Sequence, residues 1–486
     1  MKTAGVAGAG IGGLSAAIHL ASAGYDVTIF EKNSKPGGKA SELREDGFRF
    51  DTGPSLITMK DVIDKLFNAA GEDAGEYLGI KRLDILCRYF FADGTILDTH
   101  SDFKKTAAEI ESKTKSTREE LTRYYAYSKE IFDLTKDIFL YDTYKGIRSI
   151  FKSEYFKTLF KIHKIDSGRT MHEANAAFFQ DKRIVQIFDR YATYNGSNPY
   201  RAPATLNLIS HVENSLGGYY AVNGLYELVE AIYKLALKKG VKFNFKTNIT
   251  GINKTGNEIT GIEAGGNKYS FDYYVSNVDA LTSNEIFFRN ESGITGDKLL
   301  STSALVFYWG IEGEFEQLKA HNILFSEDYK REFDCLFEKG EIAEDVTVYI
   351  YISSKFAEKD APEGCENWYV MINTPPDSGQ DWEIILEKYR EIIINKIESA
   401  LGVNIRERIK FEKTLTPRSI KDSTGSYKGS LYGLSSNTKF SAFKRQPNKS
   451  KKYKNLYYCG GSAHPGGGIP LVILSGKNVA ELIQSS

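Results

Sequence analysis

The sequence predicts an α/β fold of two domains, one of which is assembled from segments far apart in the chain. The first observation is an apolar strand pattern at residues 3–7, followed by a glycine-rich loop and a helix pattern at 14–23. The second is a similar order of strand, glycine loop and helix at 455–483, with the helix pattern at 473–483. The third is the length of 486 residues, which is too long for a single hydrophobic core. Together they predict a Rossmann-type domain that carries an inserted, mixed α+β domain.

Each glycine of the first loop has a physical role. Gly8 permits the tight turn, Gly10 lets the backbone approach a pyrophosphate, and Gly13 lets the helix pack on the strand. The N–H groups and the positive dipole at the start of the helix favour phosphates. A second strand pattern at 26–30 leads to Glu31, 18 positions beyond Gly13, where an acidic residue holds an adenosine ribose. The opening of the chain therefore predicts a bound dinucleotide.

A second pair of glycines follows the acidic residue. Gly37 and Gly38 precede Lys39, and a turn-rich run at 47–55 contains Gly53. Glycines here would let more backbone approach a cofactor, although on the residues alone the pair is equally a simple turn. The arrangement resembles the superfamily of flavin amine oxidases and carotenoid desaturases. That resemblance implies FAD, held in extended form across both halves of the chain.

The residues between the two glycine loops predict the inserted domain. A hairpin signal at Gly94 precedes amphipathic helix patterns at 101–140, and strand patterns at 305–309, 346–352 and 368–373 suggest a mixed sheet along one wall of a cavity. We expect an FAD-binding domain formed by residues 1–85, 217–285 and 440–486, and a substrate-binding domain formed by residues 86–216 and 286–439.

Composition limits the class of partner. The chain has 63 basic and 63 acidic residues, so nothing favours a nucleic acid. Its 30 Tyr and 29 Phe suit a protein that surrounds a long apolar ligand, and they suit a well-packed core equally. Four cysteines without metal-ligand spacing predict reduced thiols of a cytosolic protein and no metal site. We expect no secretory signal, and no membrane-spanning helix because no run of about 18 apolar residues occurs.

The segment 144–164 has a different composition from its surroundings. Lysine and arginine side chains are interleaved with aromatic and aliphatic ones, and Glu154 is the single acidic residue of the segment. A helix here would carry a broad apolar face with a basic rim, which is typical of a segment lying in a membrane interface. The alternative is a surface helix that packs on its own core.

Two motifs indicate a narrower family. Residues 187–203 contain Arg-Tyr-Ala-Thr-Tyr, then Gly, Asn-Pro and Ala-Pro, and residues 464–470 read His-Pro-Gly-Gly-Gly-Ile-Pro. Both resemble the bacterial phytoene-desaturase type of FAD-dependent carotenoid desaturase. Ala463 stands where this family usually has Thr, and Leu471 where it usually has Gly. A bulky Leu471 would reshape the pocket beside the flavin, and the chain is more similar to the hydroxycarotenoid 3,4-desaturases.

The resemblance also implies the residues of the site. Arg190, His211 and Glu213 are candidates for polar contacts near the flavin, although spacing assigns no catalytic base and lone histidines are usually structural. The second glycine loop precedes a helix whose N-terminus would stabilise negative charge on the flavin. The residues expected to bind FAD are Gly8, Gly10, Ile11, Gly12, Gly13, Glu31, Lys32, Gly38, Lys39, Gly53, Pro54, Ser55, Ile249, Asn277, Gly460, Gly461, Gly468, Ile469 and Pro470.

The implied reaction is a desaturation in carotenoid biosynthesis. A hydride leaves an allylic carbon for flavin N5 and a proton leaves the neighbouring carbon, with a membrane quinone or oxygen as the final acceptor. The expected substrate is a 1-hydroxylated linear or monocyclic carotenoid, and the expected location is the cytoplasmic side of the inner membrane, with peripheral attachment. A phytoene desaturase, a reduced-FAD carotene cis–trans isomerase, a non-catalytic carrier and an amine oxidase remain alternatives.

Overall fold

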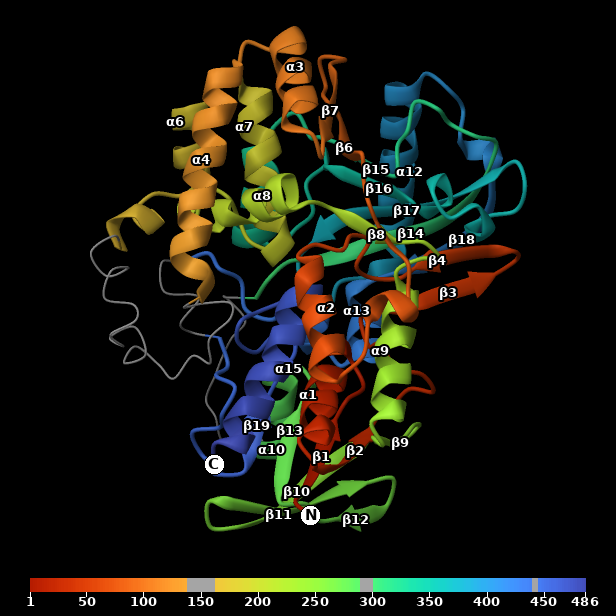
Figure 1. Cartoon of the computed structure of the whole chain (residues 1–486). Helices are drawn as coiled ribbons and strands as arrows, with labels where there is room; N and C mark the ends of the chain where they lie inside the picture. Colours follow the sequence, from red (N-terminus) through yellow and green to blue (C-terminus); the bar gives the residue numbers. More distant parts are fainter. Residues whose placement is uncertain (138–161, 289–299, 439–444) are drawn as a thin grey trace.

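The structure is a computed structural model that describes residues 1–137, 162–288, 300–438 and 445–486 (Figure 1). Of the predicted membrane-interface segment 144–164, residues 144–161 lie outside the described residues. In the part of the chain that is described, no helix is long and apolar enough to cross a membrane.

A parallel sheet of five strands lies in the lower half of the molecule in Figure 1. Each neighbouring pair in it is parallel. In spatial order the strands are β19 (Leu456–Tyr458), β13 (Tyr273–Ser276), β1 (Thr3–Ala7), β2 (Asp26–Phe30) and β9 (Lys242–Asn244). The strand beside β2 thus comes from more than 200 residues further along the chain.

Helices from the beginning, middle and end of the chain lie beside this sheet. Helices α1 and α15 pack backbone to backbone, because a Cβ on Gly476 would lie 2.5 Å from the carbonyl oxygen of Gly12. The hydroxyl of Ser15 donates to the carbonyl of Ile473 at 2.7 Å. The helices are α1 (Ile11–Ser22), α2 (Lys60–Ala69), α9 (Tyr226–Lys238) and α15 (Ile469–Gln484).

Helices α1 and α15 both begin earlier than predicted, at Ile11 rather than residue 14 and at Ile469 rather than residue 473. The cause is similar at both ends. Glycines of the loops enter the first helical turn of α1, and Pro470 is tolerated in the first turn of α15, where a backbone N–H has no intrahelical partner. Each glycine loop is therefore itself the start of a helix.

A mixed sheet of seven strands forms the upper right of Figure 1. All neighbouring pairs in it are antiparallel except β15 and β6. In spatial order the strands are β18 (Ile409–Leu415), β14 (Ser303–Glu312), β17 (Cys365–Thr374), β16 (Val348–Ile352), β15 (His321–Leu324), β6 (Ile85–Phe90) and β7 (Ile96–His100). One face packs on α12 (Trp382–Leu401) through residues such as Trp309 and Trp368.

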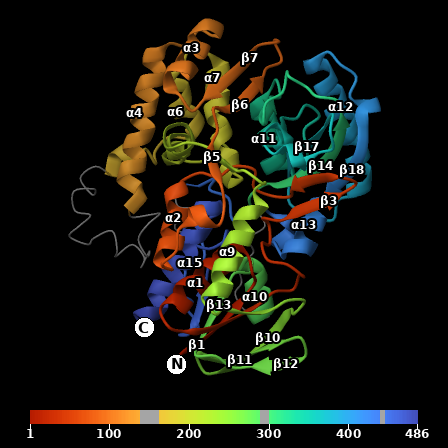
Figure 2. The ribbon, with the colours of Figure 1, turned by 45° about the vertical axis from the view of Figure 1, so that its right-hand side comes forward.

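A helical group stands beside β6 and β7, and the turned view in Figure 2 shows it at the same end of the molecule as the mixed sheet. Threonines cap two of these helices: Thr117 and Thr170 each form a capping box with a glutamate three positions later. The members are α3 (Phe103–Lys113), α4 (Arg118–Thr135), α6 (Met171–Phe178), α7 (Lys182–Asp189) and α8 (Leu208–His211).

Smaller elements complete the fold. A buried arginine, Arg49 on β4, pairs with Asp360 at 3.0 Å and with Asp51, and Asp51 accepts from the backbone N–H of Leu225 and Tyr226 at the start of α9. The remaining elements are β3 (Glu42–Glu45), β4 (Phe48–Asp51), β5 (Ile80–Arg82), β8 (Tyr219–Ala221), β10 (Ile249–Thr255), β11 (Glu258–Ala264), β12 (Asn267–Tyr269), α10 (Ala280–Phe288), α11 (Tyr329–Asp334) and α13 (Pro417–Thr424).

Candidate active site

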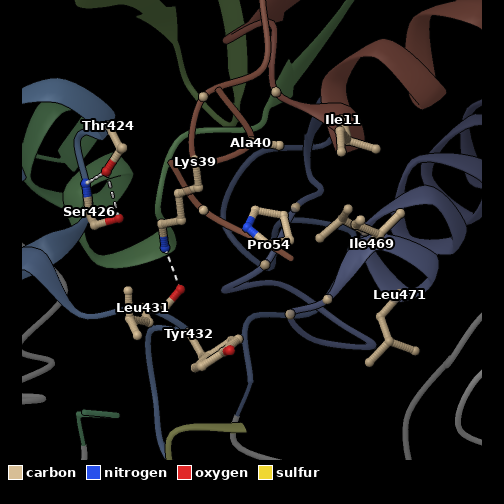
Figure 3. A pocket seen from close by; sticks show the side chains of 18 of the residues that line it. Ile11, Lys39, Ala40, Pro54, Thr424, Ser426, Leu431, Tyr432, Ile469 and Leu471 are labelled. Carbon is tan, nitrogen blue, oxygen red and sulfur yellow. Dashed lines mark hydrogen bonds between the residues drawn. The ribbon is translucent and has the colours of Figure 1, made fainter. Parts of the chain in front are cut away.

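A cavity of about 1470 Å³ runs from the two glycine loops to the inner face of the mixed sheet. Figure 3 shows part of it, with Ile11 at the start of α1 and Ile469 at the start of α15 on one side. Both parts of the molecule contribute walls, so residues from the beginning, middle and end of the chain meet around one space.

The first glycine loop forms one end of the cavity. Gly8, Gly10 and Gly12 line it with Ile11, and Gly10 forms a parallel bridge with Gly37. Gly13 does not line the cavity: a Cβ there would lie 2.3 Å from the carbonyl oxygen of Gly8, so the residue serves the packing of the helix on the loop. The contact of Gly13 with Gly8 agrees with the packing role expected for Gly13 from the sequence.

Asn277 lies between the two glycine loops. A Cβ on Gly10 would lie 2.6 Å from its Nδ2, and a Cβ on Gly12 or Gly460 would lie 2.7 or 2.6 Å from its Oδ1. Asn277 follows β13, and its backbone N–H donates to the carbonyl of Ala7 at 2.8 Å. One amide side chain thus occupies the space that three glycines leave free.

Glu31 is 5% exposed at the end of β2 and lines the cavity. Its carboxylate accepts from the backbone N–H of Ala9 and from that of Asn33, each at 2.8 Å. Lys32 beside it donates to the carbonyl of Asp422 at 2.7 Å, and burial lowers the pKa of this lysine. Ile249, at the start of β10, lines the same end of the cavity.

Lys39 carries its ammonium group to the opposite wall. Its Nζ donates to the carbonyl of Leu431 at 2.5 Å, a contact drawn in Figure 3. Burial lowers the pKa of Lys39, and the negative charge of nearby Asp279 opposes this shift. Burial likewise raises the pKa of Asp279, and the positive charge of Lys39 opposes that shift. A Cβ on Gly53 would lie 2.0 Å from the carbonyl oxygen of Lys39, which explains a glycine there.

The second glycine loop closes the cavity from the C-terminal side. The remaining residues expected to bind the cofactor all line the cavity here or beside Lys39: Gly38, Pro54, Ser55, Gly460, Gly461, Gly468, Ile469 and Pro470. Leu471 also lines it, one residue after Pro470, and Figure 3 shows its side chain beside the start of α15. The structure therefore brings the two predicted halves of a dinucleotide site together.

Of the three candidate polar residues, the structure brings two together. Arg190 donates to Glu213 at 3.1 Å, both side chains are buried, and both residues line the cavity. Tyr191 also donates to Glu213, at 2.9 Å. His211 does not line the cavity and lies against Phe132, with ring centroids 5.1 Å apart. Burial lowers the pKa of His211, which fits the structural role that lone histidines usually have.

The aromatic wall was not identified from the sequence. Tyr308, Tyr349 and Tyr369 lie on neighbouring strands, with Tyr308 opposite Tyr369 and Tyr349 opposite Met371. These side chains face the cavity, whereas their immediate neighbours face α12. Because side chains along a strand point alternately to the two faces of a sheet, the sequence could have indicated which residues share a face. Only the pairing of the strands determines that the tyrosines lie close together.

A chain of hydrogen bonds crosses this wall. The Tyr349 hydroxyl lies 2.7 Å from the Ser55 hydroxyl and 2.8 Å from Nδ1 of His321. Burial, with a smaller effect of Arg190, lowers the pKa of His321 to about 3, so its imidazole is neutral at physiological pH. All three residues line the cavity.

The residues present fit FAD. A helix N-terminus with a close backbone approach suits a pyrophosphate, a buried carboxylate at the end of β2 suits a ribose, and the second helix N-terminus suits the flavin. Within the described ranges, no group of His, Cys, Asp and Glu is placed to hold a metal ion.

Comparison with known proteins agrees with this geometry. A family model described as flavin containing amine oxidoreductase matches residues 11–484. The chain is 41% identical to a 1-hydroxycarotenoid 3,4-desaturase of Flavobacterium sp., over 100% of both chains. It is 32% identical to a 4,4'-diaponeurosporene oxygenase of Staphylococcus haemolyticus, over 99% of this chain and 96% of that one.

Solved structures share the fold at low identity. A Methanosarcina mazei oxidoreductase superposes with a TM-score of 0.64 at 14% identity, covering 99% of this chain and 100% of that chain. Putrescine oxidase bound to putrescine superposes with a TM-score of 0.64 at 12% identity, covering 100% of this chain and 99% of that chain.

Proposed function

The chain belongs to the family of flavin-containing amine oxidoreductases, among its carotenoid desaturases and oxygenases, and we propose that it introduces a C–C double bond into a 1-hydroxylated carotenoid. The protein is an FAD-dependent oxidoreductase. The substrate is a linear or monocyclic carotenoid, and the new bond forms near its hydroxylated end. Full-length similarity to a 1-hydroxycarotenoid 3,4-desaturase supports this assignment.

The observation that carries the proposal is the shape of the cavity. A dinucleotide site at one end opens directly onto a wall of aromatic and aliphatic side chains, which suits a long apolar molecule better than a small polar one. The wall includes Leu134, Ile165, Leu206 and Ile209 from the helical side and Tyr308, Tyr349, Tyr369 and Met371 from the mixed sheet.

The residues expected to bind the cofactor have distinct tasks. FAD, when bound, supplies the two-electron oxidation by accepting a hydride from an allylic carbon. Gly10 and Gly12 admit the pyrophosphate, Glu31 holds the ribose, and Lys39 and the start of α15 lie along the flavin half. The tyrosine wall orients the polyene and excludes water.

Proton removal needs only a weak acceptor, and Glu213 is poorly suited to that role. Its carboxylate already accepts from Arg190, Tyr191 and Tyr194, so its oxygens are occupied by fixed donors. The proton of the neighbouring carbon therefore passes to a hydroxyl of the wall. The pair of Arg190 and Glu213 is a structural part of the wall.

The hydroxyls of Ser55 and Tyr349 are suited to a hydroxylated substrate. They form a polar row in a largely apolar wall and are supported by His321. A carotenoid hydroxyl that joins this row exchanges hydrogen bonds with water for hydrogen bonds with the protein. A carotenoid without that hydroxyl forms no hydrogen bond with the row, which favours the hydroxylated substrate.

The remaining parts of the proposal concern domains, location and electron acceptor. Residues 1–85, 217–285 and 440–486 form the FAD-binding domain, and residues 86–216 and 286–439 form the substrate-binding domain. The basic, apolar segment 144–164 attaches the protein peripherally to the cytoplasmic side of the inner membrane. A membrane quinone or oxygen reoxidises the flavin.

Anaerobic mixing of the purified holoenzyme with a 1-hydroxylated carotenoid tests the proposal. We expect the flavin absorbance to bleach and the carotenoid to lose two hydrogens. Incorporation of oxygen in an aerobic assay would instead indicate an oxygenase, as some relatives are named. An unchanged mass with altered geometry, only when FAD is reduced beforehand, would indicate an isomerase. An unchanged carotenoid under both conditions would indicate a carrier.

A further inference from the structure

Arg445 is a buried cation whose partners among the described residues are all neutral. Its side chain is only 7% exposed and lines the cavity. The guanidinium donates to Oδ1 of Asn195 at 2.5 Å and to the carbonyls of Gly461 and Tyr432 at 3.3 and 3.5 Å. Within the described ranges, no carboxylate lies within salt-bridge distance of it. Burial lowers the pKa of Arg445 to about 10, so the side chain remains charged at neutral pH.

The other arginines that are buried in the described part of the chain have carboxylate partners. Arg49 lies beside Asp51 and Asp360, and Arg190 lies beside Glu213. A buried charge without an opposing charge is unfavourable, and it is normally paired or neutralised. The lone charge of Arg445 at a cavity wall therefore indicates that an anionic group occupies the space beside it during function.

The position of Arg445 indicates which anion this is. The guanidinium packs on the second glycine loop, since a Cβ on Gly466 would lie 3.3 Å from its central carbon. His464 in the same loop contributes no charge, because burial, with an added effect of Arg445, lowers the pKa of His464 to about 4. Two positive features thus lie on this loop: Arg445 and the N-terminus of α15 at Ile469.

We infer that Arg445 stabilises the negative charge that the flavin ring gains when it accepts a hydride. The inference rests on the proposed function only in assuming bound FAD and hydride acceptance. A hydride brings two electrons and one hydrogen nucleus to the ring, so the ring gains one negative charge, while the substrate loses its proton separately. Arg445 lowers the free energy of that charged ring without taking part in proton transfer.

The alternative to this inference is that Arg445 anchors the pyrophosphate of FAD. The first glycine loop and the N-terminus of α1 already provide a pyrophosphate site at the other side of Asn277. A phosphate anchor would affect how tightly FAD is held, whereas the role inferred here affects how readily bound FAD accepts negative charge. These two properties are measured separately.

Sulfite binding to the holoenzyme tests the inference without any carotenoid. Sulfite adds to the same ring nitrogen as a hydride and leaves the same negative charge on the ring. In R445Q we expect sulfite affinity to fall about tenfold and the flavin midpoint potential to become more negative. R445K, which keeps the charge, should retain most of both properties. R406Q is a matched control, because Arg406 is 40% exposed and pairs with Glu391 at the surface.

A second variant keeps the test decisive if R445Q does not fold. N195D places a carboxylate beside Arg445 and offsets its charge while the arginine remains, so we expect sulfite affinity and potential to fall in the same direction. Unchanged sulfite affinity and potential in R445Q and N195D would overturn the inference. So would weaker FAD retention in R445Q with unchanged sulfite affinity, which would assign Arg445 to the phosphates. Because no carotenoid is present, failure of this inference and failure of the proposed function are distinguishable.

Discussion

Glu213 accepts a hydrogen bond from Arg190 at 3.1 Å, and both side chains are buried at the wall of the cavity. Tyr89, Tyr191 and Tyr194 surround the guanidinium, with its central carbon 5.5, 4.6 and 5.3 Å from the ring centroids. This relationship fixes the 3-10 helix Arg190–Asn195, which follows α7, to the helical turn that holds Glu213. The pair is a rigid element that shapes the cavity, and its loss should affect stability before it affects chemistry.

Replacing Glu213 by Gln should reduce the free energy of unfolding by about 3–5 kcal/mol, because it leaves Arg190 buried and uncompensated. Urea unfolding of the holoenzyme measures this loss. The double variant R190Q/E213Q should recover part of it, since it removes both charges. A loss below about 1 kcal/mol in E213Q would contradict the structural role of the pair.

Replacing Glu31 by Gln should weaken FAD binding roughly tenfold to a hundredfold, because a charged acceptor of hydrogen bonds contributes about 1.5–3 kcal/mol. Fluorescence titration of the apoprotein with FAD measures the affinity. D26N is the matched control, since Asp26 lies at the start of the same strand and pairs with Lys242 at the surface. Equal FAD affinity in E31Q and D26N would show that Glu31 does not hold the ribose.

Replacing Gly12 by Ala should lower both FAD affinity and stability, the latter by about 1–3 kcal/mol. The added Cβ would lie 2.7 Å from Oδ1 of Asn277 and 2.9 Å from the backbone of Gly460, so the two glycine loops must separate. In G168A the added Cβ meets no atom within 4 Å, and we expect no change. Thermal unfolding with and without added FAD compares the variants, and wild-type behaviour of G12A would refute the close approach.

Replacing Tyr349 by Phe should reduce the preference for a hydroxylated over a non-hydroxylated carotenoid by roughly twofold to tenfold, the value of one hydrogen bond. The ratio of kcat/KM for the two substrates measures this preference. Y369F is the control: Tyr369 lines the same wall, but its hydroxyl donates to the sulfur of Met371 at 3.5 Å. An unchanged ratio in Y349F would remove Tyr349 from substrate selection.

Acidification should destabilise the protein in part through His321. The folded-state pKa of His321 is about 3, against 6.5 ordinarily, so below pH 6.5 the unfolded chain binds a proton that the folded chain does not. Its contribution to stability is therefore present above pH 6.5 and is lost as the pH falls towards 3, by about 1.4 kcal/mol per pH unit. Unfolding free energies of wild type and H321Q between pH 6.5 and 4.5 test this. The H321Q slope should be shallower, and parallel slopes would contradict the prediction.

The local patterns of the sequence predicted the elements that depend on local rules. The strand, glycine loop and helix at each end of the chain are present, and Ile249 begins β10 beside the cavity. Glycine positions carried this information, because close backbone contacts exclude a Cβ wherever the surrounding side chains come from.

Contacts between distant segments could not be predicted in the same way. The neighbour of β2 is β9, and the tyrosine wall forms only when β14, β16 and β17 pair in register. Arg445 is one basic residue in a run of several, and its burial without a carboxylate is visible only in three dimensions. His211 was a candidate for a polar contact near the flavin, together with Arg190 and Glu213, but its side chain packs on α4.

The most direct test of the central claim is a mass and absorption analysis of carotenoids in cells that accumulate a 1-hydroxylated precursor, with and without this chain. We expect the precursor to lose two hydrogens and its absorption to shift to longer wavelength, because each new double bond extends the conjugated polyene. An unchanged hydroxylated precursor, together with conversion of phytoene in a parallel strain, would contradict the account and assign the chain to phytoene desaturation.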